Sequence, residues 1–241
     1  MRIAVLSDIH GNYWALSRVL LNAEKRKVDS IINLGDSLYG PLKPKETYHL
    51  IKSTGIISVS GNEDRLILEK YHNSSTLNYV LGELNEEAAE WLKSQPKTFV
   101  LEQDIFLCHG TPDSDSTYLI EQIYNDYVSV KNSEMIDEQL KGVKQKIVLC
   151  GHSHLPKIIH TSARLIINPG SVGCPAFDDD SPVYHKVETF SNYARYCIVE
   201  ILDGEVLIEQ ISVPYNYEIA VNCAMKNDRP DWAKWIQTGR A

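Results

Sequence analysis

The sequence predicts an α/β fold in which two β-sheets pack face to face with helices outside them. Two observations lead to this prediction. The first sixty residues alternate strand-forming runs with helical periodicity, which is typical of parallel strands joined by crossover helices. The last third contains three β-forming runs, two of them joined by the hairpin dipeptide Asp203-Gly204. We therefore expect the second half to form an antiparallel sheet that packs on the first.

Local patterns predict the elements of the first 110 residues. Apolar residues recur at helical spacing from Trp14 to Ala23, and a later helix starts at the capping residue Asn85 and stops before Pro96. The expected order is strand 2–7, helix 13–26, strand 30–34, helix 44–53, strand 56–60, helical sequence over 62–95 broken at 73–75 and 82–85, and a hairpin of 98–101 with 105–109.

Beyond residue 110 the expected elements are mainly strands. They are a loop followed by mostly helical sequence over 111–146, strands at 147–150, 157–160, 164–167, 183–190, 194–202 and 206–213, and a short helix near the C-terminus. The acidic run Asp178-Asp179-Asp180 should lie in a loop. Trp232 and Trp235 should cover an edge of the sandwich, with a dimer contact as the alternative.

Composition limits the class of protein. We expect the 241 residues to form a single domain, with 214–241 as an extension that packs on it. The net charge of −8 and the absence of a Lys/Arg-rich run argue against binding of a nucleic-acid backbone. The five cysteines are irregularly spaced, and we find no secretory signal and no run of ~20 apolar residues. These features predict a cytoplasmic protein that does not span the membrane. A homo-oligomer is possible.

Metal-type ligands follow five of the predicted strands. The clusters are Asp8-Ile9-His10, Gly35-Asp36, Gly61-Asn62, Cys108-His109-Gly110 and Gly151-His152-Ser153-His154. Singly, each is also compatible with a loop cap or a turn. In an open α/β sheet, however, ligand sites lie beyond the carboxyl ends of the strands, so five such clusters should meet at one rim. Together they predict a two-metal hydrolytic centre.

The spacing within the clusters suggests how the ligands converge. Asp8 and His10 are two residues apart, as are His152 and His154, and on an extended chain each pair would point to the same side. Asp36 stands alone at the end of a central strand, which makes it the natural bridge between two ions.

Asn62 adds a neutral carbonyl oxygen to this set and His109 an imidazole. Nitrogen and oxygen donors without a thiolate suit Mn, Fe, Zn, Ni or Co. Two divalent ions bring about +4 charges, and the carboxylates of Asp8 and Asp36 with a bridging hydroxide leave roughly +1. That charge would attract a small phosphoester or polyphosphate despite the acidic protein.

The five clusters, in this order, resemble the calcineurin-like metallophosphoesterase superfamily, whose signature is D-x-H, G-D, G-N-H-[D/E], H and G-H-x-H. The resemblance runs from residue 1 to about residue 213 and includes Cys108-His109-Gly110-Thr111-Pro112 and Asn168-Pro169-Gly170-Ser171-Val172. Gly40-Pro41 and Pro214-Tyr215 are similar to the small bacterial and archaeal branch of predicted phosphodiesterases. The resemblance implies a four-layer α/β/β/α sandwich of two mixed sheets flanked by helices.

The resemblance also implies a ligand set and a reaction. One metal would be held by Asp8, His10, Asp36 and His154, and the other by Asp36, Asn62, His109 and His152. A hydroxide bridging two divalent ions, with Mn favoured, would attack phosphorus in line, without a covalent enzyme intermediate.

The chain departs from the family pattern at two places. Glu63 stands at the position of the G-N-H histidine, which in the family assists the leaving group. The candidate catalytic residues are therefore Asp36, Asn62, Glu63 and Asp64. For Glu63, the plainer interpretation is a surface glutamate at the start of a helix, where the helix dipole favours it. Without that histidine, phosphodiesters and activated esters should be favoured over monoesters. Ser37-Leu38-Tyr39-Gly40 also lacks the phosphate-binding arginine of Ser/Thr protein phosphatases, which argues against that activity.

Two residues are weaker candidates for substrate binding. Asn12 could touch substrate or cap the first helix, and Tyr118 could line the pocket or simply pack. The leading prediction is a dinuclear metal-dependent phosphodiesterase. The alternatives are a hydrolase of dinucleoside polyphosphates such as diadenosine tetraphosphate, and a catalytically silent interaction module of the same fold.

Overall fold

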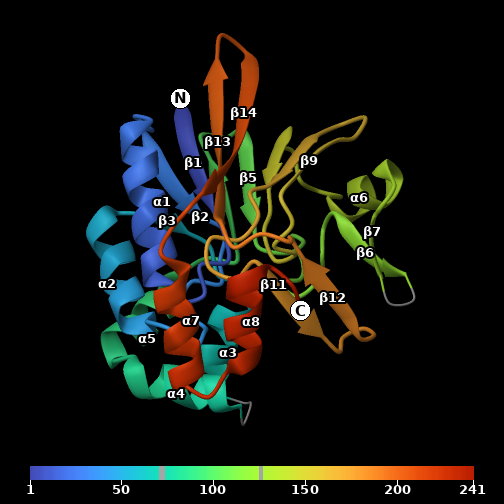
Figure 1. Cartoon of the computed structure of the whole chain (residues 1–241). Coiled ribbons are helices and arrows are strands. Elements are labelled where there is room, and N and C mark those ends of the chain that lie inside the picture. Colours follow the sequence, from blue (N-terminus) through green and yellow to red (C-terminus); the bar gives the residue numbers. More distant parts are fainter. Residues whose placement is uncertain (71–73, 125–126) are drawn as a thin grey trace.

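Two five-stranded mixed sheets form the centre of the computed structural model, which describes residues 1–70, 74–124 and 127–241 (Figure 1). The first sheet has the order β14-β13-β1-β2-β3, with β1 Arg2–Leu6, β2 Ser30–Asn33, β3 Ile57–Ser58, β13 Ala194–Leu202 and β14 Glu205–Val213. The second has the order β4-β5-β8-β10-β9, with β4 Thr98–Leu101, β5 Ile105–Cys108, β8 Ile147–Leu149, β9 Lys157–His160 and β10 Leu165–Asn168.

Strand alternation sends side chains of the first sheet to two separate cores. Ile3 and Val5 of β1 face the second sheet, where they pack with residues such as Leu107 and Leu149. Ala4 and Leu6 point the other way, into the helix layer. Because successive residues of a strand face opposite sides, an apolar strand such as β1 fits between two layers.

Helices cover the outer faces of both sheets, which confirms the predicted four-layer α/β/β/α sandwich. The first sheet is covered by α1 Tyr13–Lys25, α2 Pro44–Thr54, α3 Asn62–Glu69, α4 Ser75–Glu83 and α5 Glu86–Ser94. On the second sheet, Ile136 of α6 Ser133–Gln139 packs against Phe106 and Val148. The predicted break at 73–75 separates α3 from α4; Asn73 lies outside the described residues, and Ser74 caps α4 through Leu77 N.

The predicted antiparallel sheet of the C-terminal half is wrong. The hairpin around Asp203-Gly204 is present, but β13 joins the first sheet by pairing antiparallel with β1, Ile3 opposite Val199. The physical reason is that β13 is apolar on both faces. Cys197 and Val199 enter the core between the sheets and Tyr196 enters the helix layer, as befits an internal strand.

Two further elements correct the predictions from sequence. The stretch 111–146 is not mostly helical: it contains the hairpin of β6 Glu121–Tyr124 and β7 Tyr127–Val130, and α6 is short. Asp178 and Asp179 lie in a strand, β11 Ala176–Asp179, which pairs with β12 His185–Glu188. These strands have four residues each, and three of the four carry charged residues, so the apolar alternation that identifies a strand is weak in them.

The C-terminal tail forms two helices, α7 Tyr217–Lys226 and α8 Pro230–Thr238, with α8 beside β11 (Figure 1). Pro230 at the start of α8 and the left-handed Gly239 at its end are typical helix boundaries. Trp232 and Trp235 pack with Cys174 and Ala176 in a separate core, and the expectation that they cover an edge of the sandwich stays a prediction. Among the described residues, no helix combines the length and apolarity needed to cross a membrane.

Candidate metal centre

The predicted metal ligands lie together at the rim where β1, β2, β3, β5 and β8 end. β1, β2 and β3 are parallel neighbours, as are β5 and β8, so their carboxyl ends face the same way within each sheet. Among the described residues, donor atoms within 4.8 Å of one another form three groups. The first two are Asp8 with His10 and His154, and Asp36 with His109 and His152, and the third joins His10 and Asp36 to Glu63.

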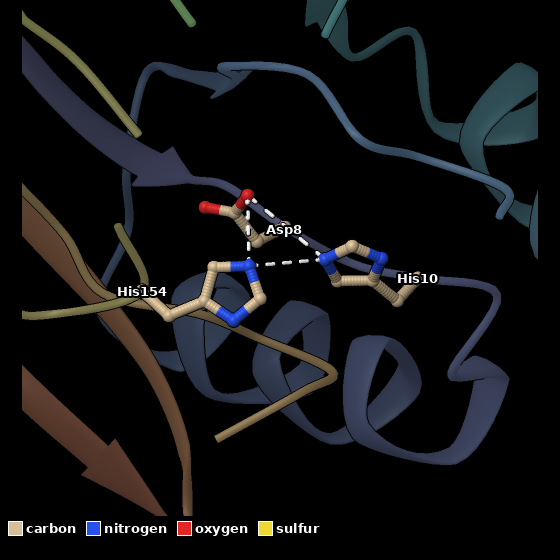
Figure 2. A group of neighbouring side chains, drawn as sticks. All are labelled: Asp8, His10 and His154. Carbon is tan, nitrogen blue, oxygen red and sulfur yellow. Dashed lines mark hydrogen bonds and ion pairs between the residues drawn. The ribbon is translucent and has the colours of Figure 1, made fainter. Parts of the chain in front are cut away.

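The first group is shown in Figure 2. Asp8 Oδ1 lies 3.3 Å from His154 Nε2 and 4.0 Å from His10 Nε2. The other ring nitrogen of each histidine contacts a backbone carbonyl, His10 Nδ1 at 3.0 Å from Tyr39 O and His154 Nδ1 at 2.6 Å from Cys174 O. The two Nε2 atoms therefore face each other at 3.1 Å, and only a proton or a cation can hold two such nitrogens so close.

The second group is centred on His109. Its Nε2 lies 3.0 Å from Asn62 Oδ1 and 3.3 Å from Asp36 Oδ2, while its Nδ1 contacts Leu34 O at 2.8 Å. The ring of His152 lies 5.1 Å from the His109 ring. Here too a backbone carbonyl orients the imidazole so that one nitrogen faces the oxygen ligands.

The surroundings of the Asp8 carboxylate indicate whether a cation fits this centre. Both of its carboxylate oxygens are buried, and within the described part of the chain neither accepts a hydrogen bond. A buried carboxylate without donors is costly unless a cation neutralises it. Together with the nitrogen and oxygen donor set, this favours divalent transition metals at both groups.

The carboxylates of the centre raise the pKa of two of its histidines. Burial alone would lower the pKa of His109, but the carboxylates of Asp36 and Asp8 outweigh it and raise that pKa to about 10. For His10, burial is likewise outweighed, chiefly by Glu63, and the pKa rises to about 9. Divalent ions would displace these protons.

Five of the predicted ligands adopt left-handed backbone conformations, with φ between 52° and 66°, namely Asp8, His10, Asp36, His152 and His154. The expectation that the Asp-x-His and His-x-His pairs lie on extended chain is therefore wrong. Each such conformation costs on the order of 1 kcal/mol and persists only where contacts enforce it. Gly61 shows how tight these contacts are, because a Cβ there would overlap the Asp36 carboxylate.

The two acidic residues after Asn62 differ in position. Glu63 is partly exposed in the pocket, and its Oε2 lies 3.0 Å from His10 Nδ1. Asp64 is fully buried, where it accepts hydrogen bonds from the backbone N–H groups of Ser37 and Gly61. Asp64 thus holds two rim loops together and is not among the residues that line the pocket, and the catalytic role predicted for it stays a prediction.

Asn12 does not contact the pocket either. It is fully buried, its Oδ1 accepts a hydrogen bond from Ala15 N at the start of α1, and its Nδ2 donates to Gly173 O and Tyr215 Oη. The structure therefore shows Asn12 as the cap of α1, and its contact with substrate stays a prediction.

Tyr118 packs beneath a ligand and does not line the pocket. Its ring lies 4.8 Å from the His152 ring, and its hydroxyl lies 2.9 Å from Nε2 of the buried His185. His185 Nδ1 in turn contacts Val183 O at 2.8 Å. Tyr118 and His185 thus connect β12 to the metal-ligand rim.

A pocket of about 330 Å³ opens beside the two groups. Besides rim residues, β11 contributes Phe177, Asp178 and Asp179 to it, and the C-terminal tail contributes Arg229 and Trp232. Sequence reasoning missed Phe177 and Arg229 because no local motif marks them. The acidic run was noticed, but as a loop without a place near the centre.

Comparisons with known proteins agree with this geometry. Residues 1–190 match the family model of the calcineurin-like phosphoesterase superfamily domain. The uncharacterized protein MJ0912 of Methanocaldococcus jannaschii is 28% identical over 257 residues, which cover 95% of this chain and 94% of that protein.

Solved structures show the same fold. A metallophosphoesterase from Sphaerobacter thermophilus superposes with a TM-score of 0.78 at 24% identity, covering 99% of this chain and 100% of the other. A putative diadenosine tetraphosphatase gives a TM-score of 0.55 at 18% identity, covering 88% of this chain and 94% of the other. The family model matches most of the chain, and the Asp and His groups at the rim fit metal ions. The chain therefore belongs to the calcineurin-like phosphoesterase superfamily, a family of dimetal-dependent phosphoester hydrolases.

Proposed function

We propose that this protein is a dinuclear metal-dependent phosphodiesterase that acts on a small organic phosphodiester. The observation that carries the proposal is the pair of adjacent donor groups beside a pocket of about 330 Å³, one of them holding the buried carboxylate of Asp8, for which the described residues supply no hydrogen-bond donor. A pocket of this volume is at the small end of the range for small-molecule sites.

The proposed ligands divide between two ions. Asp8, His10 and His154 would hold one ion and Asn62, His109 and His152 the other, with Asp36 between them. Asp36 suits the bridging place because its carboxylate belongs both to the group with His109 and to a group with His10. When bound, two divalent ions supply an activated nucleophile and stabilise negative charge on the phosphoryl oxygens.

The residues of the chain orient this centre. Backbone carbonyls fix three of the imidazoles, and the N–H of Glu63 donates to Asp36 Oδ1 at 2.9 Å. The Glu63 carboxylate faces His10 Nδ1, so its proposed role is to orient that ligand. The leaving group then receives no proton from a histidine at this position, which favours esters whose leaving groups depart as stable anions.

Charge in the pocket favours a diester over more highly charged substrates. Glu63, Asp178 and Asp179 line it together with a single guanidinium, that of Arg229. At an effective dielectric constant of about 20, one extra negative charge roughly 8 Å from a carboxylate costs about 2 kcal/mol. A phosphodiester carries one negative charge, whereas a monoester carries close to two at neutral pH.

A dinucleoside polyphosphate hydrolase remains the second candidate. Its motivation is that a similarly folded protein is a putative diadenosine tetraphosphatase. Such a substrate carries several negative charges, which the three pocket carboxylates oppose. The silent interaction module is a weaker alternative, because all seven ligand positions are filled and converge on one rim.

Comparison of three substrates tests the proposal. With Mn²⁺ added, bis-p-nitrophenyl phosphate should be hydrolysed faster than p-nitrophenyl phosphate or diadenosine tetraphosphate. Asp36→Asn should abolish this activity, which excludes a contaminating enzyme. Exclusive monoester hydrolysis would contradict the diester proposal. A protein that holds no stoichiometric divalent ion even after reconstitution would favour the interaction module, whereas bound metal without hydrolysis of any of the three would point to a different natural substrate.

A further inference from the structure

Arg229 is a pocket residue that lies outside the motifs of the family pattern. The turn after Gly35-Asp36 lacks the arginine that would bind phosphate in a protein phosphatase. Among the described residues that line the pocket, Arg229 is the one arginine, and no lysine accompanies it. It lies beyond residue 190, where the match to the family model ends.

The guanidinium of Arg229 is held in a defined orientation. Its Nε donates to Asp231 Oδ1 at 2.9 Å and its Nη2 to Asp231 Oδ2 at 2.5 Å. The guanidinium carbon lies 5.7 Å from the centre of the Trp232 ring, a cation–π contact. Within the described part of the chain, no hydrogen bond involves Nη1, so the N–H groups of this nitrogen are available to a ligand.

The position of Arg229 is linked to the metal-ligand rim. The Trp232 ring, which makes the cation–π contact with the guanidinium, also packs edge-on against the His10 ring, with centres 5.7 Å apart. Tyr39 and Cys174, whose carbonyls orient His10 and His154, line the same pocket. A group that binds the ions would therefore lie in the pocket that Arg229 faces.

We propose that Arg229 binds the phosphoryl group of the substrate and that the C-terminal tail thereby forms part of the substrate site. The inference rests on the proposed function above. A planar guanidinium with free N–H groups recognises phosphoryl oxygens and stabilises the charge that grows on them during the reaction. Since Glu63, Asp178 and Asp179 line the same pocket as this one guanidinium, the site suits a phosphodiester with a single negative charge.

Three substitutions in Mn²⁺-loaded protein test the inference. Arg229→Gln should lower kcat/KM for bis-p-nitrophenyl phosphate about 100-fold while both metals stay bound, and Arg229→Lys should fall between it and the unmodified protein. In Arg229→Ala, added guanidinium ions should restore part of the activity, which a purely structural role would not allow. The matched control is Arg240→Gln, because Arg240 belongs to the same tail and also lies over an aromatic ring, that of Phe190 at 4.9 Å, but does not line the pocket.

A binding measurement separates this inference from the proposed function. Inorganic phosphate is titrated into each Mn²⁺-loaded variant by calorimetry, and Arg229→Gln should bind it about 10-fold more weakly than Arg240→Gln. That result supports the inference even if no diester is hydrolysed. Equal phosphate affinity in the two variants, or diester hydrolysis by Arg229→Gln within twofold of the unmodified protein, would overturn it.

Discussion

The metal-ligand rim gathers side chains from five strand ends, whereas much of the remaining pocket lining comes from β11 and the C-terminal tail. At the rim, Asp8 and His109 are almost wholly buried, and the neighbouring loops are joined by backbone hydrogen bonds such as His10 N to Asp36 O at 3.0 Å. In the wall formed by β11 and α8, Phe177 and Arg229 are partly exposed and Asp178 is exposed. The buried, hydrogen-bonded rim therefore suits side chains that must keep a fixed geometry, and the more exposed wall suits side chains that contact a ligand.

This difference separates two tasks of the site. If the rim residues hold the metal ions as proposed, changes there should affect every substrate equally. We expect wall residues to contact the parts of a substrate that the ions do not hold, so changes there should alter the ratio between substrates. Substitutions in the two regions can therefore be told apart by metal content and by substrate preference.

The largest effect is expected at the rim, for Asp8→Asn. The amide keeps the shape but removes the charge that would neutralise one ion, so kcat/KM should fall by about 1000-fold for all substrates. Metal analysis should show one equivalent of Mn²⁺ in place of two. Asp104→Asn, an equally conservative change at an exposed turn between β4 and β5, should leave both values unchanged. Full activity of Asp8→Asn would exclude Asp8 as a ligand.

Gly61→Ala should have the next largest effect. Its Cβ would overlap the Asp36 carboxylate, which must then move, and metal affinity should drop by about 100-fold. Gly82→Ala is the matched control, because a Cβ at this position in α4 meets nothing within 4 Å. That control should stabilise the protein by roughly 0.5–1 kcal/mol. If Gly61→Ala bound both metals normally, the rim would be more deformable than its contacts indicate.

The sequence predicts the rim better than it predicts the wall. Each ligand cluster directly follows its strand, so the pattern of an apolar run and a polar cluster is enough to locate it. The partner of β13 could not be predicted, because its pairing with β1 joins residues nearly 200 positions apart. Arg229 reaches the pocket only through the packing of α8 on Cys174 and Ala176, and no local pattern encodes such a contact.

Tyr118→Phe tests the connection between wall and rim. Removing the hydroxyl leaves Nε2 of the buried His185 without its partner, which should lower the free energy of unfolding by about 1–3 kcal/mol. Metal content should remain at two equivalents, because the ring still packs on His152. Tyr184→Phe removes an exposed hydroxyl that bonds Asp178 and should change stability by less than about 0.5 kcal/mol. Chemical denaturation of both variants measures the difference, and equal stabilities would mean that the hydroxyl of Tyr118 does not stabilise the fold.

The smallest effect, and the most specific to the wall, is expected for Asp178→Asn combined with Asp179→Asn. Both carboxylates line the pocket, so their removal should raise kcat/KM for p-nitrophenyl phosphate about fivefold while changing that for bis-p-nitrophenyl phosphate little. The gain should shrink as salt is added, because these groups are partly exposed to solvent. Asp180→Asn alters the neighbouring exposed carboxylate, which does not line the pocket, and should leave the ratio unchanged. An equal gain for both substrates would mean that the wall affects metal binding, and the division between rim and wall would fail.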